Sequence, residues 1–128
     1  AGLKDSSGDF RQFQAFRAAS PELAITVGNE TDIARAIAEG GAGTICGMAN
    51  IVPELVKAMI DGPGAEARMQ AAIDVLMSGP SLVPTMKAIL AAQTGDAGWL
   101  RVRPPLRPGS DGAAYKAKLD ALAAAAMV

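Results

Sequence analysis

The sequence predicts an α/β protein in which a short parallel sheet is followed by a helical region. Short apolar runs alternate with segments of helical periodicity over residues 1–62, which is the pattern of strands joined by crossover helices. Residues 63–128 contain amphipathic and alanine-rich segments and no further strand-like run. We therefore expect an α/β region over residues 1–62 and a helical region over residues 63–128.

Three apolar runs predict the strands of the sheet. The first run ends at Lys4, the second spans Leu23–Val27, and the third spans Gly43–Met48. A segment of helical periodicity lies between each run and the next. We therefore expect parallel strands joined by right-handed crossovers.

Capping and turn residues mark where the helices begin and end. Asp9 is suited to cap the first helix and Thr31 the second, while Pro53 suits the first turn of the third. Further helices are expected over Ala65–Ser78, Ser81–Ala92 and Asp111–Met127, with an extended loop over Thr94–Ser110.

The composition limits the classes of function. The chain has 128 residues, enough for one domain, and its formal net charge of -1 argues against a nucleic-acid-binding surface. One cysteine and no histidine exclude a disulfide framework and most zinc sites, so we expect no metal centre. There is no signal-peptide pattern and no apolar run long enough to span a bilayer. We expect a soluble, cytoplasmic protein without a membrane partner.

The predicted sheet is incomplete. Three short parallel strands leave two unpaired edges, and the chain starts without an initiator methionine, with its first strand already ending at Lys4. A closed parallel barrel typically needs about 250 residues. We therefore expect this chain to be part of a larger polypeptide, with roughly half of such a barrel elsewhere.

Lys4 is unusually placed for a lysine. It ends an apolar run and is followed at once by small and hydroxyl-bearing residues. At the end of a buried strand, low dielectric would favour the neutral amine, which is the form that a Schiff-base nucleophile requires. The placement alone favours an ordinary solvated or ion-paired lysine over a nucleophile.

Five segments in order resemble the dihydrodipicolinate synthase and N-acetylneuraminate lyase superfamily. They are Gly2–Asp9, Val27–Asn29, Gly40–Asn50, Val83–Lys87 and Val102–Leu106. The resemblance implies a class I pyruvate-dependent lyase or aldolase on a (β/α)8 barrel, usually a homotetramer. It also implies that residues 1–62 run from the end of strand six through strand eight, and that residues 63–128 form the C-terminal helices.

The same resemblance assigns roles to individual residues. Lys4 matches the Schiff-base lysine, and Ser6 matches a position that touches the substrate beyond its pyruvate part, although a loop serine bonded to nearby backbone is equally compatible. Gly28 matches a site where backbone approaches the substrate, or it is simply a turn glycine. Ile45 matches a position whose backbone lies beside bound pyruvate, with its side chain expected in the core.

Asn29 and Glu30 follow at the rim of the expected site. They could set specificity or cap the next helix. Asp5 should point away from Lys4, toward packing or a salt bridge, because alternate residues of a strand face opposite sides.

The function implied is a carbon–carbon lyase or aldolase that uses pyruvate and an aldehyde, with no cofactor other than the covalent imine at Lys4. The segment after Lys4 looks more like the sugar-acid and hydroxy-oxo-acid aldolases than like dihydrodipicolinate synthase. The latter remains an alternative, as does a non-catalytic barrel relative. The family's tyrosine proton relay and carboxylate-binding loop lie on earlier strands, so this chain alone should be inactive without the N-terminal half of the barrel.

Overall fold

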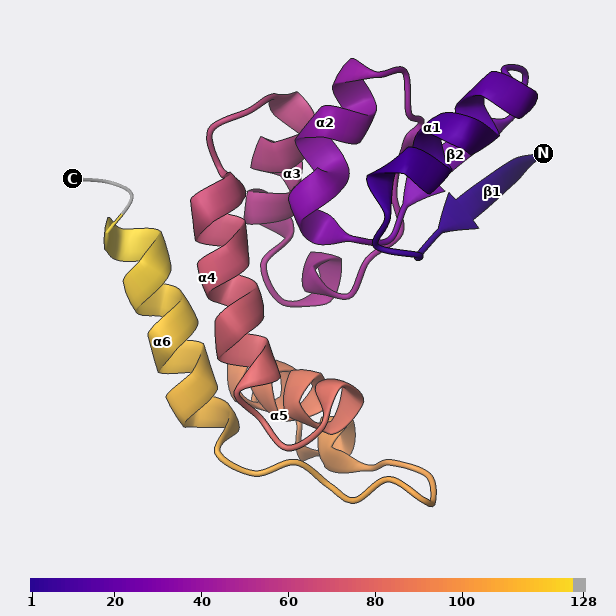
Figure 1. Ribbon diagram of the computed structural model, residues 1–128. Helices are drawn as coiled ribbons and strands as arrows, with labels where there is room; N and C mark the ends of the chain where they lie inside the picture. Colours follow the sequence, from indigo (N-terminus) through magenta and orange to yellow (C-terminus); the bar gives the residue numbers. More distant parts are fainter. Residues whose placement is uncertain (126–128) are drawn as a thin grey trace. The chain divides into compact units, whose positions relative to one another are not determined.

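The expected alternation of strands and helices is present in the structure, a computed structural model that describes residues 1–125 (Figure 1). The strands are β1 (Gly2–Asp5), β2 (Ala24–Val27) and β3 (Gly43–Thr44). The α-helices are α1 (Phe10–Ala19), α2 (Ile33–Ala38), α3 (Pro53–Asp61), α4 (Glu66–Met77), α5 (Leu82–Thr94) and α6 (Gly112–Ala125). Short 3-10 helices are η1 (Glu30–Asp32), η2 (Met48–Asn50) and η3 (Ala97–Leu100).

The strands form one parallel sheet in the order β1-β2-β3. Lys4 pairs with Thr26, and Thr26 pairs with Gly43. Because side chains alternate along a strand, the sheet has two different faces. One face carries the buried Ile25 and Val27, each at most 3% exposed, and the other carries Lys4 and Thr26.

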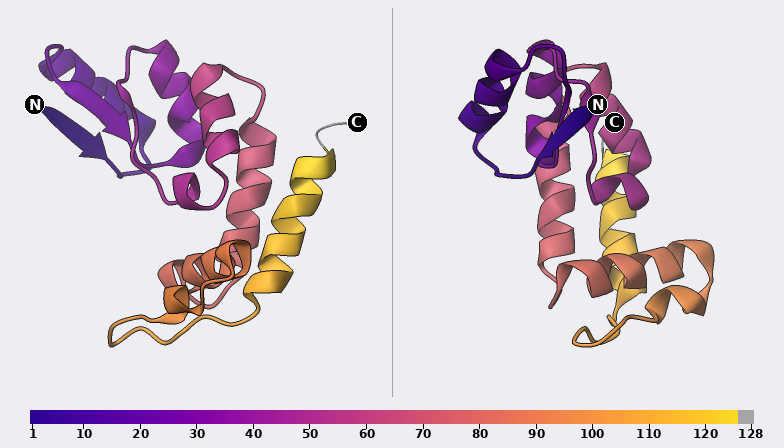
Figure 2. Two further views of the ribbon diagram at one scale, coloured as in Figure 1. Left: turned by 180° about the vertical axis from the view of Figure 1, so that it is seen from behind. Right: turned by 90° about the vertical axis from the view of Figure 1, so that its right-hand side faces the viewer.

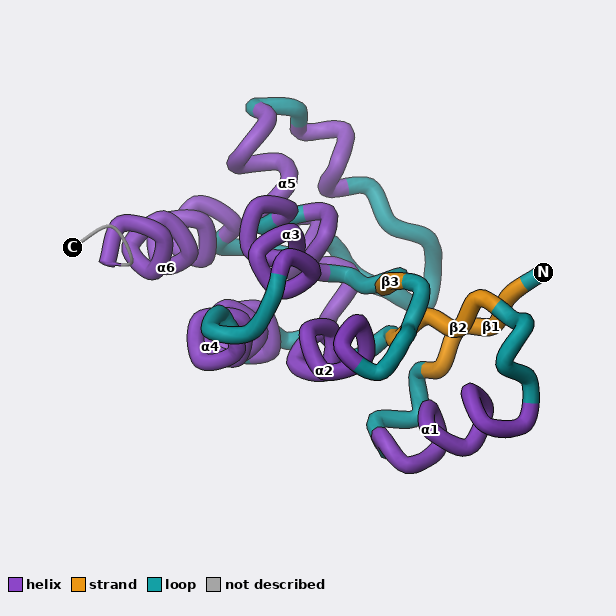
Figure 3. The backbone as a smooth tube through the Cα atoms, turned by 90° about the horizontal axis from the view of Figure 1, so that it is seen from above, coloured by secondary structure: helices purple, strands orange, loops and turns teal. Residues whose placement is uncertain are grey.

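Helices cover the first face. Helix α1 lies on one side of β1 and β2, as Figure 3 shows, and its Phe13 is 1% exposed. Asp9 caps α1 as expected, since its side chain accepts a hydrogen bond from the backbone N–H of Arg11. The wholly buried Ile33 of α2 completes this part of the core.

Two sequence predictions about this region were wrong. The third strand was expected over Gly43–Met48, but only Gly43–Thr44 is strand, because just one further ladder bond, from the Ile45 N–H to the Val27 carbonyl, continues it. Thr31 was expected to cap the second helix, but it lies inside η1, and its hydroxyl accepts a hydrogen bond from the Asn29 amide instead.

The chain divides into two compact units, Ala1–Met69 and Gln70–Val128. In the second unit, α5 and α6 are in contact (Figure 2). Pro84 is accommodated within the first turn of α5, where a backbone N–H has no helical partner to lose. The predicted long loop contains η3, and the Lys87 amine donates a hydrogen bond to the Arg101 carbonyl.

Helix α6 is described as far as Ala125, and the predicted continuation to Met127 lies outside the described residues. The assignment of domains to residues 1–62 and 63–128 stays a prediction. Over residues 1–125, no single helix is long and apolar enough to cross a membrane. Helices α4 and α5 reach that length and apolarity only when taken together, and a bend of 102° separates them.

Candidate active site

Lys4 lies near the end of β1, on the sheet face opposite α1. Its side chain is exposed in this structure, which corrects the expectation of a buried amine. The reason is local: the helices cover the face that carries Ile25 and Val27, and Lys4 projects from the other one. Within residues 1–125 the amine has no hydrogen-bond or ion-pair partner.

Gly28, directly after β2, is where three of the predicted site residues meet. A methyl group placed on Gly28 would collide with the Ser6 hydroxyl and would lie 3.0 Å from Cε of Lys4. Real Cβ atoms essentially never lie as close to a neighbour as this methyl group would lie to the Ser6 hydroxyl, and the distance of 3.0 Å to Cε is shorter than nine in ten real Cβ contacts. The missing side chain of Gly28 therefore leaves the space that the Lys4 stem and the Ser6 hydroxyl occupy.

The backbone fixes this arrangement. The Gly28 N–H donates to the Asp5 carbonyl over 2.6 Å, which holds the turns after β1 and β2 side by side. Ser6 lies two residues beyond Lys4, so an extended path brings both side chains to the same face. The prediction that Ser6 and Lys4 share a face is confirmed by their common proximity to Gly28.

A hollow of about 260 Å³ lies beside the Lys4 stem. It is lined by Gly2, Leu3, Lys4, Ala24, Thr26 and Ile45. Ile45 is 57% exposed, so the expectation that its side chain lies in the core was wrong for this chain. The side chain instead forms part of the wall of this hollow, next to β1 and β2.

Asn29 and Glu30 make structural contacts. The Asn29 amide donates to the Asp32 carboxylate over 2.6 Å and to the Thr31 hydroxyl over 3.1 Å. The Glu30 carboxylate accepts a hydrogen bond of 3.2 Å from the Met48 N–H, which joins the loops after β2 and β3. Neither side chain caps the next helix as the alternative expected, because Asn29 makes no side-chain cap bond at the start of η1 and Glu30 bonds to Met48 instead. The role of both residues in specificity stays a prediction.

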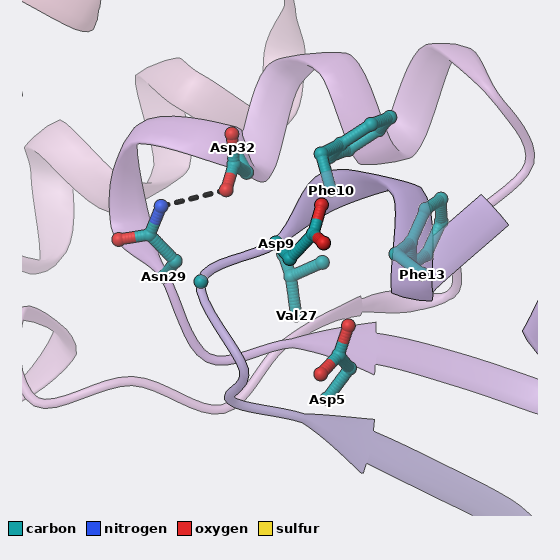
Figure 4. Close-up of a pocket in the computed structure, with 8 residues that line it drawn as sticks. Asp5, Asp9, Phe10, Phe13, Val27, Asn29 and Asp32 are labelled. Atoms are coloured by element: carbon teal, nitrogen blue, oxygen red, sulfur yellow. Dashed lines mark hydrogen bonds between the residues drawn. The ribbon is translucent and has the colours of Figure 1, made fainter. Parts of the chain in front are cut away.

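The opposite side of the sheet holds a second, much smaller cavity, drawn in Figure 4. Its volume is about 10 Å³, and its lining includes Asp5, Asp9, Phe13 and Asn29. Asp5 is 7% exposed, and its carboxylate accepts a hydrogen bond from the Ser7 N–H over 2.9 Å. Asp5 thus points away from Lys4 into packed surroundings, as predicted, and its carboxylate closes a local turn with Ser7. A space of this size holds at most about one water molecule.

Two further observations concern charged groups. The hydrogen bond from the Arg11 backbone N–H, aided by the Arg11 side chain, lowers the pKa of Asp9 below its ordinary value of 3.8.

Among residues 1–125, no three His, Cys, Asp or Glu side chains are grouped so as to hold a metal ion.

Thr26 is a site residue that the sequence analysis missed. It pairs with Lys4 in the sheet and lines the same hollow. The available signal was the spacing of two residues between Thr26 and Gly28, which places both on one face of an extended segment. Finding it also required the register between the strands, which sequence periodicity does not supply.

Comparison with known proteins identifies the family. The sequence profile of the Dihydrodipicolinate synthetase family matches residues 1–121. The chain belongs to this family. Its fold, an α/β arrangement with a small parallel sheet, is that of (β/α)8 enzymes of the family over a part of their length.

Particular relatives are lyases by name. An uncharacterized DapA-like lyase of Chloroflexus aurantiacus is 36% identical, over 86% of this chain and 38% of that protein. A DapA-like lyase of Halobacterium salinarum is 35% identical, over 93% of this chain and 42% of that protein. The chain therefore spans about two fifths of the length of these relatives.

Solved structures agree on the fold. Dihydrodipicolinate synthase from Agrobacterium tumefaciens superposes with a TM-score of 0.80 at 35% identity, over 94% of this chain and 42% of that one. The 2-keto-3-deoxygluconate aldolase of Sulfolobus, bound to D-KDPG, superposes with a TM-score of 0.76 at 16% identity, over 98% of this chain and 46% of that one. The second likeness concerns the fold alone.

Proposed function

We propose that the full-length polypeptide containing this chain is a Schiff-base-forming lyase or aldolase that cleaves or forms a carbon–carbon bond between pyruvate and an aldehyde. The observation that carries the proposal is the convergence of Lys4, Ser6 and Gly28 on one face of the sheet, at the carboxyl ends of β1 and β2. In barrels of this type the active site lies at that end of the strands. Membership of a family whose named relatives include lyases supports the reaction class.

Lys4 is the nucleophile of this proposed reaction. Its neutral amine attacks the ketone carbon of a 2-oxo acid, water leaves, and a protonated imine remains. The bond between C3 and C4 then breaks as the C4 hydroxyl loses its proton and becomes an aldehyde. The bonding electrons pass to the imine nitrogen as an enamine, which takes a proton at C3 and is hydrolysed to pyruvate and free lysine.

Other residues have supporting roles in the proposal. Ser6 contacts the aldehyde part of the substrate, and the backbone at Gly28 and Ile45 lies against the pyruvate part. The chain corresponds to the end of strand six through strand eight of the barrel, followed by C-terminal helices. The rest of the barrel supplies the proton relay and the carboxylate-binding loop, within a cytoplasmic homotetramer.

The segment Asp5–Asp9 favours a sugar acid or a 4-hydroxy-2-oxo acid as the substrate of cleavage. One observation favours a second candidate, dihydrodipicolinate synthase of lysine biosynthesis. The Agrobacterium enzyme of that name is 35% identical to this chain, well above the 16% of the sugar-acid aldolase.

Pyruvate release by the full-length protein tests the proposal. The purified protein should release pyruvate from 2-keto-3-deoxygluconate or from a simple 4-hydroxy-2-oxo acid, measured with a coupled pyruvate assay. Lys4→Arg should abolish release, because a guanidinium stays protonated and cannot attack a ketone. Lys57→Arg is the matched control, since Lys57 is exposed on α3 and bonded to Asp61.

The outcomes separate the candidates. Pyruvate release from either 2-oxo acid supports the aldolase. Consumption of pyruvate with formation of dihydrodipicolinate, and no cleavage of either acid, supports the synthase. Full activity in the Lys4→Arg variant would reject both, because each depends on the same imine.

A further inference from the structure

Thr26 lines the same hollow as Lys4. Thr26 is the direct cross-strand partner of Lys4 in the parallel sheet. Adjacent strands lie about 4.8 Å apart, so these two residues are nearest neighbours. Among the residues that line the hollow, Thr26 and Lys4 alone have polar side chains, and the others are glycine, alanine, leucine and isoleucine.

The hydrogen bonding of Thr26 determines what it can offer to Lys4. Its hydroxyl donates to the Leu3 carbonyl over 3.4 Å. A hydroxyl has one hydrogen to donate and two lone pairs that accept. With its hydrogen directed to Leu3, the hydroxyl can only accept from the amine, and the amine is without a partner among residues 1–125.

We infer that Thr26 is a positioning residue for the Schiff-base chemistry of Lys4. Its hydroxyl accepts an N–H of the neutral amine and limits the motion of the four-carbon stem beside Gly28, so that the nitrogen lone pair faces the substrate ketone. The inference rests on the proposed function of Lys4. It adds Thr26 to the group formed by Lys4, Ser6 and Gly28. Thr26 is chosen because it pairs with Lys4 in the sheet and because it is the one other polar side chain that lines the hollow.

Two substitutions separate the hydroxyl from the shape of the side chain. Thr26→Val keeps the branched shape and removes the hydroxyl, while Thr26→Ser keeps the hydroxyl and removes the methyl group. In the full-length protein, we expect Thr26→Val to slow imine formation with pyruvate by about three- to tenfold, the effect of one ordinary hydrogen bond. Thr26→Ser should retain most of the wild-type rate.

Thr44→Val is the matched control. Thr44 is also a half-buried strand threonine, and its hydroxyl donates to the Val27 carbonyl over 2.8 Å, a shorter bond than that of Thr26. It does not line the hollow that contains Lys4. We expect Thr44→Val to lower the thermal stability at least as much as Thr26→Val does, without slowing imine formation.

The measurement is the rate at which borohydride-trappable adduct accumulates with pyruvate, followed by intact mass, together with the melting temperature of each variant. A slow Thr26→Val variant, with normal Thr26→Ser and Thr44→Val variants, supports the inference. A normal Thr26→Val rate, a Thr26→Ser variant as slow as Thr26→Val, or equal slowing by Thr44→Val would overturn it. If the wild-type protein forms no adduct, the proposed function fails, and the inference with it.

Discussion

At Gly28 the absence of a side chain leaves room for two neighbours that carry the proposed chemistry. A methyl group there would collide with the Ser6 hydroxyl and press on Cε of Lys4 at 3.0 Å. The backbone of Gly28 does not lie in the left-handed region, so the requirement for glycine is one of space. This distinguishes Gly28 from Gly8 and Gly40, whose positive φ angles already favour glycine.

Gly28→Ala should therefore reduce imine formation by displacing Lys4 and Ser6. A shift of about 1 Å at a reacting group can cost about a hundredfold in rate, so we expect a loss of roughly that size in the full-length protein. Ser6→Ala should partly restore the Gly28→Ala variant, because it removes the atom with which the new methyl group collides. Trapping of the pyruvate adduct measures each rate.

The double variant provides the control for this prediction. If Gly28→Ala and Ser6→Ala act independently, their effects on the free energy of activation add. Additive losses, with no recovery in the double variant, would show that Ser6 and Gly28 do not share the space that the structure gives them.

Among the secondary-structure elements, α1 shows how a single cap links local sequence to pH dependence. The Asp9 carboxylate accepts the backbone N–H of Arg11, and this hydrogen bond lowers the pKa of Asp9 in the folded state. A carboxyl group whose pKa is lower in the folded than in the unfolded state stabilises the fold at any pH above its unfolded-state pKa. This stabilisation is lost as the pH falls through the folded-state pKa.

We therefore expect Asp9 to contribute to a loss of stability of the full-length protein as the pH drops below 3.8, the ordinary pKa of aspartate. Asp9→Asn keeps an oxygen that can cap the helix but removes the titration. Urea unfolding at several acidic pH values should show a flatter pH dependence for Asp9→Asn than for the wild type. Parallel curves for the two proteins would contradict this account of the cap.

The elements also show what sequence reasoning reaches and what it does not. Local signals located α1 and α3 well, because Asp9 and Pro53 determine where these helices begin. The length of the third strand was overestimated. An edge strand can extend only as far as the strand with which it pairs, and β2 ends at Val27, the partner of Thr44.

The candidate site, too, could be predicted from the sequence only in part. The shared face of Ser6 and Lys4 follows from the period of two within one segment, whereas the roles of Lys4, Ser6 and Gly28 followed from the resemblance to the family. Thr26 depends on the register between strands, and the exposure of Lys4 and Ile45 depends on which face the helices cover. These are long-range properties, and they cannot be read from a single segment.

For the whole molecule, the main feature is a sheet that closes on neither side within the described residues. Strands β1 and β3 are both edges, and the face that carries Lys4 borders an open hollow with an exposed Ile45. Unpaired parallel edges and exposed apolar surface promote association between chains. We expect residues 1–128, expressed alone, to aggregate or to bind a hydrophobic dye strongly.

Size-exclusion chromatography and denaturant unfolding test this expectation. A soluble monomer with one cooperative unfolding transition would contradict it, because such a chain would be stable without any partner for its strand edges.

The central claim, that Lys4 forms an imine with pyruvate, can be tested directly on the full-length protein. Incubation with pyruvate and borohydride should add one reduced pyruvyl group, and peptide mapping should place it on Lys4, while Lys4→Ala should give no adduct and keep its fold. An adduct on another lysine, such as Lys57 or Lys87, or an unmodified wild-type protein, would contradict the account.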